Sequence, residues 1–242
     1  MDKINLKFLL LGGALVLTVA GLVLLSGGGA TEQVGAASTP AVVAVAEQPS
    51  APALVKVNAD QALAKPNPLG EIVLGDPSAP VTVIEYASLT CGHCGAFHNQ
   101  VLPEIKRDYV DKGLVKFYFR PFPFDGVATA GAMLTQCVAP GARLTLLDLL
   151  FKRQAELVQS KDPFSQLQIY AKQAGLSEAK FMACLQSQDN LDAIREMQAI
   201  AGSELGVNST PTFFINGEKV TGNVGAEAFR KILDEKLAAE GI

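Results

Sequence analysis

The chain has 242 residues, of which 49% are hydrophobic, and a formal net charge of -4 at pH 7. This size allows one well-buried domain with additional segments. The sequence has no basic run and no alternation of basic with aromatic residues, which argues against a nucleic-acid partner. With only 4 cysteines and 2 histidines, few side chains are available for thiol or metal chemistry.

The N-terminal residues predict a targeting segment. Lys3 and Lys7 precede an uncharged apolar run over 8–25, and no basic residue follows it closely. The positive-inside rule then places residues 1–7 in the cytoplasm and the rest of the chain across the membrane. The length of the run favours a transmembrane anchor, with a signal peptide cleaved after Ala30 as the alternative. Both predict a periplasmic or otherwise extracytoplasmic domain, where disulfides persist.

Residues 26–68 are rich in Ala, Gly, Pro, Ser and Thr and contain no aromatic residue. This composition predicts a flexible linker, partly extended by its prolines. A short edge strand over 41–46 is the alternative. The ordered domain is predicted over 69–242.

The pattern of that domain indicates an α/β fold. Short apolar runs predict strands over 71–74, 81–86, 114–120, 212–215 and 219–221. Helices are predicted over 91–112, with a kink at Pro103, and over 226–239. Between 126 and 205 no strand signal occurs, and the apolar spacing predicts several helices. The order is therefore β-α-β, a helical insertion, and β-β-α.

Two cysteines separated by two residues, Cys91-Gly92-His93-Cys94, follow the strand predicted over 81–86. The first sulfur then lies at a helix N-terminus, where unpaired N–H groups and the helix dipole favour a thiolate. Such a thiolate attacks disulfides, and a second sulfur one turn later attacks the resulting mixed disulfide. We predict that Cys91 is the nucleophile and Cys94 the resolving cysteine, with His93 adding a donor or a positive charge.

A metal site is the alternative for this motif. Zinc prefers four ligands, often from two such pairs, and this chain has only one pair. His98 could join Cys91 and Cys94 as a third ligand, an arrangement that suits copper. An inert disulfide staple is less consistent with the motif, because so short a loop contributes little stability.

This order of elements resembles a thioredoxin fold carrying the inserted helical subdomain of the DsbA-family thiol:disulfide oxidoreductases. Three features carry the resemblance: the Cys-Gly-His-Cys motif, Glu85 within the preceding strand, and the tract Gly206-Val207-Asn208-Ser209-Thr210-Pro211-Thr212-Phe213-Phe214 before the hairpin. It covers about 69–242, with the insertion over about 126–205, and is closest to membrane-anchored or exported bacterial members. It implies no metal and no cofactor beyond a redox-active Cys91–Cys94 disulfide.

The resemblance also implies roles for other residues. Glu85 is expected to assist proton transfer at the resolving cysteine, with a solvent-facing strand residue as the alternative. Thr210 and Pro211 are expected to form a cis peptide that presents backbone to an extended substrate, with an ordinary trans proline as the alternative. Phe122 is expected to line the same shallow apolar groove.

The other two cysteines, Cys137 and Cys184, flank helices of the predicted insertion. As in related insertion-bearing proteins, they are expected to form a structural disulfide, contributing roughly 4 kcal/mol on the chain-entropy account. Two independent buried thiols are the alternative.

The resemblance implies a dithiol oxidase that introduces disulfides into exported cysteine-containing proteins. A membrane partner resembling the DsbB-type quinone reductases would reoxidise it. Two alternatives remain open: a reductase or isomerase using the same residues, and a copper-binding module. Gly92 stands where the best-known oxidases have proline, so the motif alone does not set the direction of electron flow.

Overall fold

The computed structural model describes residue 65 and residues 67–242. The predicted segments 1–7 and 8–25, the alternative strand over 41–46 and nearly all of the linker lie outside the described residues. Within the part that is described, no helix combines the length and the apolar character needed to cross a membrane. Asn67, near the start of the described residues, is already buried, and its carbonyl accepts a hydrogen bond from the Gly70 amide at 2.8 Å.

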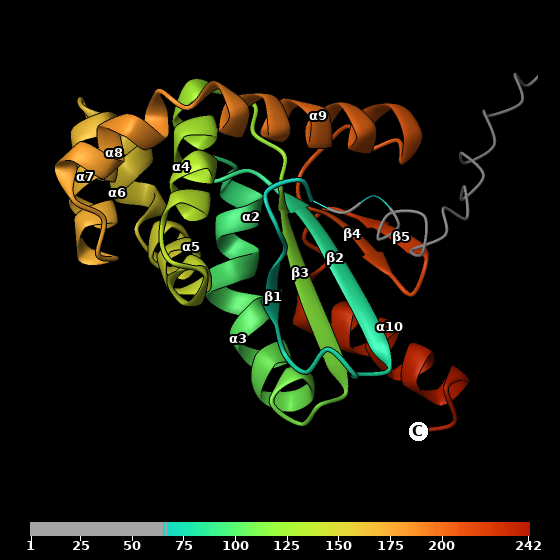
Figure 1. The fold of residues 1–242 in the computed structure, drawn as a ribbon. Coiled ribbons are helices and arrows are strands. Elements are labelled where there is room, and N and C mark those ends of the chain that lie inside the picture. The colour runs from blue at the N-terminus through green and yellow to red at the C-terminus, as the bar shows by residue number, and fades with distance from the viewer. Residues whose placement is uncertain (1–64, 66) are drawn as a thin grey trace, which may run out of the picture. The chain divides into compact units, whose positions relative to one another are not determined.

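The centre of the domain is a five-stranded sheet in the order β1-β3-β2-β4-β5 (Figure 1). Its strands are β1 (Ile72–Leu74), β2 (Val81–Ala87), β3 (Val115–Pro121), β4 (Thr212–Ile215) and β5 (Glu218–Thr221). The β2–β3 pair is parallel and the other three pairs are antiparallel. Every residue of β2 is buried, as expected for a β-branched central strand.

One helical segment follows β2, but it is less regular than the helix predicted over 91–112. It comprises α2 (Gly92–Ala96), the π-helical turn η1 (Phe97–Val101), α3 (Leu102–Ile105) and the π-helical turn η2 (Lys106–Val110). Pro103 has no N–H to donate, and the Leu102 amide reaches back five residues to the Phe97 carbonyl. The irregularity expected at Pro103 is therefore a wider turn just before it.

The inserted helices pack on one another and on the sheet. They are α4 (Gly126–Cys137), the 3-10 turn η3 (Pro140–Ala142), α5 (Arg143–Lys152), α6 (Gln154–Gln159), α7 (Pro163–Gln173), α8 (Glu178–Leu185) and α9 (Gln188–Glu204). Their core includes Leu134, Leu146 and Phe151, and it continues without interruption into Phe119 of β3 and Cys94 of α2. The insertion therefore forms one wall of the region around Cys94.

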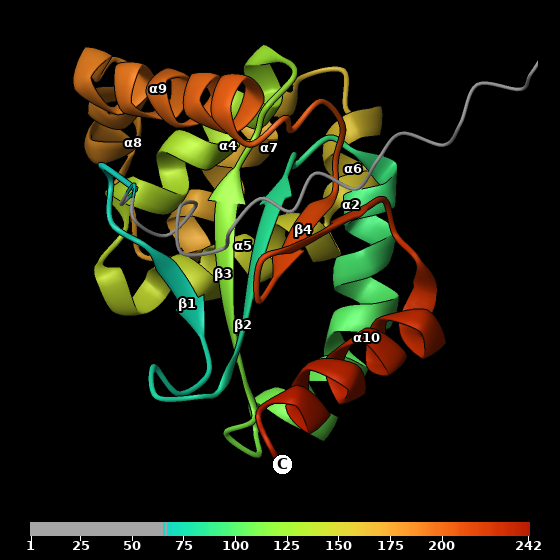
Figure 2. The same cartoon turned by 90° about the vertical axis from the view of Figure 1, so that its right-hand side faces the viewer.

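The two faces of the sheet have different covers (Figure 2). Val83 lies in a core with Phe97 of η1 and Phe229 of α10 (Gly225–Ala239). Tyr86, which points to the opposite face, packs in a separate core with Met197 of α9. Glu85 shares the face of Val83, so its carboxylate points beneath the helical segment that begins at Cys91.

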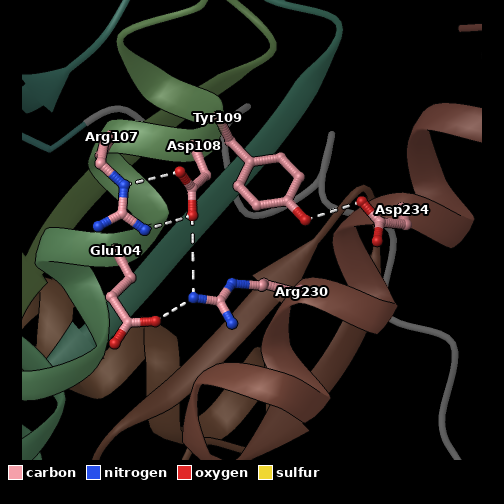
Figure 3. Close-up of polar contacts among 6 residues, drawn as sticks. All are labelled: Glu104, Arg107, Asp108, Tyr109, Arg230 and Asp234. Atoms are coloured by element: carbon pink, nitrogen blue, oxygen red, sulfur yellow. Dashed lines mark hydrogen bonds and ion pairs between the residues drawn. The ribbon is translucent and has the colours of Figure 1, made fainter.

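Polar contacts fasten α10 to that segment (Figure 3). Tyr109 of η2 donates a hydrogen bond to Asp234 at 2.8 Å, and Arg230 pairs with Glu104 of α3 and, at 3.8 Å, with Asp108. Burial and the bond to Asp234 raise the pKa of Tyr109 to about 12. These contacts lie far along the helical segment from Cys91, so they hold the scaffold rather than the sulfurs.

Candidate active site

The Cys-x-x-Cys pair lies just beyond the carboxyl end of β2. Cys91 is the N-cap residue of α2, with extended backbone, and Cys94 lies on the first turn. Both sulfurs are free thiols, and Cys91 is half-buried whereas Cys94 is fully buried. The Cys91 thiol donates a hydrogen bond to the Thr210 carbonyl oxygen at 3.3 Å. Residues 119 positions apart in the chain therefore meet at this sulfur.

The two thiols have opposite environments. A hydrogen bond from the Cys94 thiol and the backbone N–H groups of Cys94 and His93 lower the pKa of Cys91 to about 5, against the effect of burial. Burial raises the pKa of Cys94, and the hydrogen bond to Cys91 and the charge of Glu85 add to this. The dithiol form therefore holds a thiolate at Cys91 and a neutral thiol at Cys94. The imidazole of His93 is exposed, and the group of His93 that helps to lower the pKa of Cys91 is its backbone N–H.

Glu85 is fully buried, so the solvent-facing alternative is wrong. Its Oε2 lies 2.8 Å from Nε2 of His98, which is itself only 7% exposed. Its other oxygen, Oε1, has no hydrogen-bond partner among the described residues. The His98 ring stacks on Phe151 with centroids 3.7 Å apart. A buried carboxylate and an imidazole thus lie behind Cys94 as one polar pair in an apolar surrounding.

From the sequence, His98 is expected at most to be a copper ligand. In the structure its Nε2 bonds to Glu85 instead. Among residues 65 and 67–242, no group of three or more His, Cys, Asp or Glu side chains is placed to hold a metal ion. The available signal was that His98 lies one helical turn after Cys94, on the side of the helix that must face the sheet.

The peptide bond between Thr210 and Pro211 is cis, and both residues are buried directly before β4. Phe122 does not offer the apolar surface that was expected of it, because it is only 5% exposed. It packs in the core under α9, and its ring contacts the edge of Phe124, with centroids 5.4 Å apart. Phe124 is the exposed ring, with 57% of its surface accessible.

The loop that carries Phe124 is fixed to the loop before Cys91. Thr90 Oγ1 donates a hydrogen bond to Oδ2 of Asp125 at 2.5 Å. A second Asp125 oxygen accepts the Ala128 amide at 2.8 Å and caps α4. The Asp125 carboxylate therefore joins the start of α2 to the start of α4. As a result, Phe124 lies beside the cysteine motif.

Gln154 of α6 is a further contact residue that the sequence did not reveal. Its Nε2 donates to the carbonyl oxygens of Leu89, at 2.9 Å, and Cys91, at 2.8 Å. The side chain lies so close to Gly95 that a Cβ there would be 1.9 Å from Oε1. A glutamine on an insertion helix carries no signal of this kind, because the contact depends on tertiary packing.

The second cysteine pair joins α4 to α8. Cys137 and Cys184 form a disulfide with a Cα–Cα distance of 6.0 Å and a sequence separation of 47. Cys184 is buried in the core of the insertion. This bond therefore ties together two helices of the insertion.

Comparisons with known proteins agree with this geometry. A family model described as Thioredoxin matches residues 68–235. A Rickettsia conorii protein named as a protein-disulfide oxidoreductase is 28% identical over 172 residues, covering 69% of this chain and 60% of that protein. Disulfide bond formation protein D of Bacillus subtilis is 24% identical over 182 residues, covering 74% and 82% of the two chains.

The match to the Rickettsia protein thus spans less than two thirds of that relative's length. Among solved structures, alpha-DsbA1 of Wolbachia pipientis has a TM-score of 0.66 and 31% sequence identity, covering 70% of this chain and 92% of that chain. The expected thioredoxin fold with a helical insertion is confirmed. The chain belongs to the DsbA family of thioredoxin-fold oxidoreductases.

Proposed function

We propose that this protein introduces disulfides into exported, cysteine-containing proteins by thiol–disulfide exchange at Cys91 and Cys94. The observation that carries the proposal is the placement of the two thiols: Cys91 is the half-buried N-cap of α2 beside the cis peptide, and Cys94 is buried one turn later. The lowering of the pKa of Cys91 to about 5 and the raised pKa of Cys94 agree with it. A stabilised thiolate favours the dithiol form, and that preference makes the disulfide form oxidising. Cys91, which is half-buried, is the sulfur that a substrate can reach.

The reaction starts from the oxidised pair. A substrate thiolate attacks Sγ of Cys91, the bond to Cys94 breaks, and Cys94 receives the electron pair and a proton. A second substrate thiolate then attacks the substrate sulfur of the mixed disulfide and releases Cys91 as a thiolate. Two electrons pass from the substrate to the protein, one substrate proton is balanced by the proton on Cys94, and the other goes to solvent. Glu85 is the proposed proton donor to Cys94.

The proposed substrate site is the surface around Cys91, the cis peptide and Phe124. Backbone next to Pro211 pairs with an extended substrate chain in the manner of an added strand. The exposed ring of Phe124 supplies apolar contact, and the Thr90–Asp125 hydrogen bond keeps it near Cys91. Phe124 takes the place that the sequence had given to Phe122.

The compartment and partner belong to the same proposal. The protein acts outside the cytoplasm, attached through the membrane segment predicted over 8–25, and a quinone reductase of the DsbB type reoxidises it. Support comes from the Bacillus relative, which is named for disulfide bond formation, and from the Cys137–Cys184 disulfide, a bond typical of proteins in oxidising compartments.

The test is oxidation of a reduced, unfolded protein substrate by the full chain in its disulfide form. Wild type should transfer its disulfide, whereas Cys94→Ser and Cys91→Ser, which cannot form that disulfide, should not, with circular dichroism confirming that both are folded. When the thiol form of Cys94→Ser is mixed with a substrate disulfide, it should accumulate a mixed disulfide at Cys91, because the thiol that would resolve it is absent. Undiminished substrate oxidation by Cys91→Ser would contradict the proposal.

A further inference from the structure

The Glu85–His98 pair has one side toward the cysteines and one side toward a cavity. On the Glu85 side of the pair, Oε1 is buried without a partner among the described residues, and the carboxylate acts electrostatically on Cys94. Toward the cavity lies His98, which holds the other carboxylate oxygen at 2.8 Å. A carboxylate that is satisfied on one oxygen only keeps the other available for a proton.

The cavity has a volume of about 440 Å³ and lies between β1, β3, the helical segment over 97–106 and α5. Its wall is mostly apolar, with Phe119 and Leu144 among its members, and His98 is the imidazole in that wall. Its rim carries Lys106 and Lys152, whose side chains are 47% and 62% exposed. One continuous space therefore leads from solvent-exposed side chains to an imidazole that is otherwise buried.

The stacking of His98 fixes the ring rather than leaving it mobile. Phe151 lies parallel to it at 3.7 Å, and Phe97 and Phe119 meet it edge-on at 5.9 and 6.0 Å. The ring belongs to the π-helical turn η1, and such turns are frequent at functional sites. An aromatic slot would hold a phenylalanine equally well, so packing alone does not account for a histidine here.

Resting on the function proposed above, we propose that His98 passes protons between this cavity and Glu85, so that the proton taken up by Cys94 enters from the cavity between the sheet and the helical segment. When the Cys91–Cys94 bond breaks, Glu85 gives its proton to the Cys94 thiolate, His98 gives one to Glu85, and a proton that the substrate thiol has released to solvent returns through the cavity to His98. Reoxidation runs the same steps in reverse. His98 acts only through Glu85 and is therefore a positioning and relay residue.

Other titratable groups near the route are accounted for. Lys106 and Lys152 on the rim are paired with Asp111 at 2.5 Å and with Asp148 at 2.6 Å, and they stand in solvent. Arg120 and Glu71 are paired with each other on the opposite face of the sheet, alongside Tyr86. Within the described chain, the groups left to exchange a proton with Cys94 through the interior are Glu85 and His98.

The experiment is single-turnover reduction of the full-length disulfide form by glutathione, with rates corrected for glutathione thiolate at each pH. His98→Phe keeps the aromatic stack and removes the relay, and we expect a rate about tenfold lower at neutral pH with an altered pH profile. The double variant His98→Phe/Glu85→Gln should be reduced no more slowly than Glu85→Gln alone, because both changes interrupt the same proton route. Thr145→Ala, a change of an exposed residue in the same cavity wall, is the matched control and should behave as wild type.

Chemical rescue separates the relay from a structural role. In His98→Ala, added imidazole should restore the rate, and adding Leu144→Phe, which narrows the cavity, should abolish that rescue. A wild-type rate and pH profile in His98→Phe would overturn the inference, as would a loss in His98→Ala that imidazole does not restore. Either result leaves the proposed function intact if wild type exchanges and Cys91→Ser does not.

Discussion

The two cysteine pairs of this chain place the same side chain in opposite surroundings. Cys91 and Cys94 lie three positions apart at a helix N-terminus, where hydrogen bonds, helix position and burial set the two sulfurs at different pKa values. Cys137 and Cys184 lie 47 positions apart on two helices that face each other, and their sulfurs are bonded. The surroundings of the first pair suit it to exchange electrons, whereas the second pair restrains the chain.

The largest difference between the two cysteine pairs should appear in the free energy of unfolding when the second pair, Cys137 and Cys184, is removed. The double variant Cys137→Ala/Cys184→Ala releases a loop of 47 positions and should lower the free energy of unfolding by about 4 kcal/mol. Denaturant titration of the full chain measures this loss. Glutathione exchange at Cys91 should stay within a small factor of wild type, and a collapse of exchange in a variant that remains folded would break the distinction between the pairs.

The next prediction concerns the different pKa values of the two thiols in the first pair, Cys91 and Cys94. Alkylation of Cys91 by iodoacetamide should follow a titration with a midpoint at pH about 5, and Cys94 should stay unreactive in the folded protein. Cys94→Ala should raise the midpoint, because the Cys94 thiol is the largest cause of the lowered pKa of Cys91. A midpoint near that of an ordinary thiol in wild type would contradict the environment described for Cys91.

The same shift has a consequence for stability. The pKa of Cys91 is lower in the folded dithiol form than in the unfolded chain, so the folded state binds fewer protons between pH about 5 and the ordinary value of 9.0. Across that window Cys91 makes unfolding less favourable as pH rises, and its contribution is lost as pH falls through about 5. Denaturant midpoints of the dithiol form at several pH values, with Cys91→Ser as control, measure the difference.

A smaller effect is expected from Gln154, the insertion residue that contacts the motif. Gln154→Ala removes two hydrogen bonds to the carbonyls of Leu89 and Cys91 and should cost about 2 kcal/mol of unfolding free energy. Exchange at Cys91 should slow as well, because the loop before it loses its support. Gln159→Ala, on the exposed end of the same helix, is the control and should change neither quantity.

The smallest effect concerns the scaffold far from both pairs (Figure 3). Tyr109→Phe removes the hydrogen bond to Asp234 and should lower the unfolding free energy by about 1 kcal/mol. Exchange rates should be unchanged. A loss of exchange in this variant would mean that α10 and the thiols are coupled.

The sequence was sufficient for the strands and for the cysteine motif, because both depend on local patterns. The β-branched run that ends at Ala87 is typical of a buried strand, and Cys91 follows it after a short loop. Contacts between distant segments were out of reach: nothing in the sequence places Gln154 against Gly95. Phe122 and Phe124 illustrate the same limit, since alternate residues of one loop differ in exposure only through packing under α9.

We propose that the Cys91–Cys94 disulfide is oxidising because its dithiol form is stabilised. The most direct measurement is the equilibrium of this pair with reduced and oxidised glutathione, using the full chain and alkylation to read the redox state. We expect the pair to be reduced by glutathione under conditions in which glutathione stays largely oxidised. A strongly reducing, thioredoxin-like equilibrium would contradict it and would make the protein a reductase or isomerase built on the same residues.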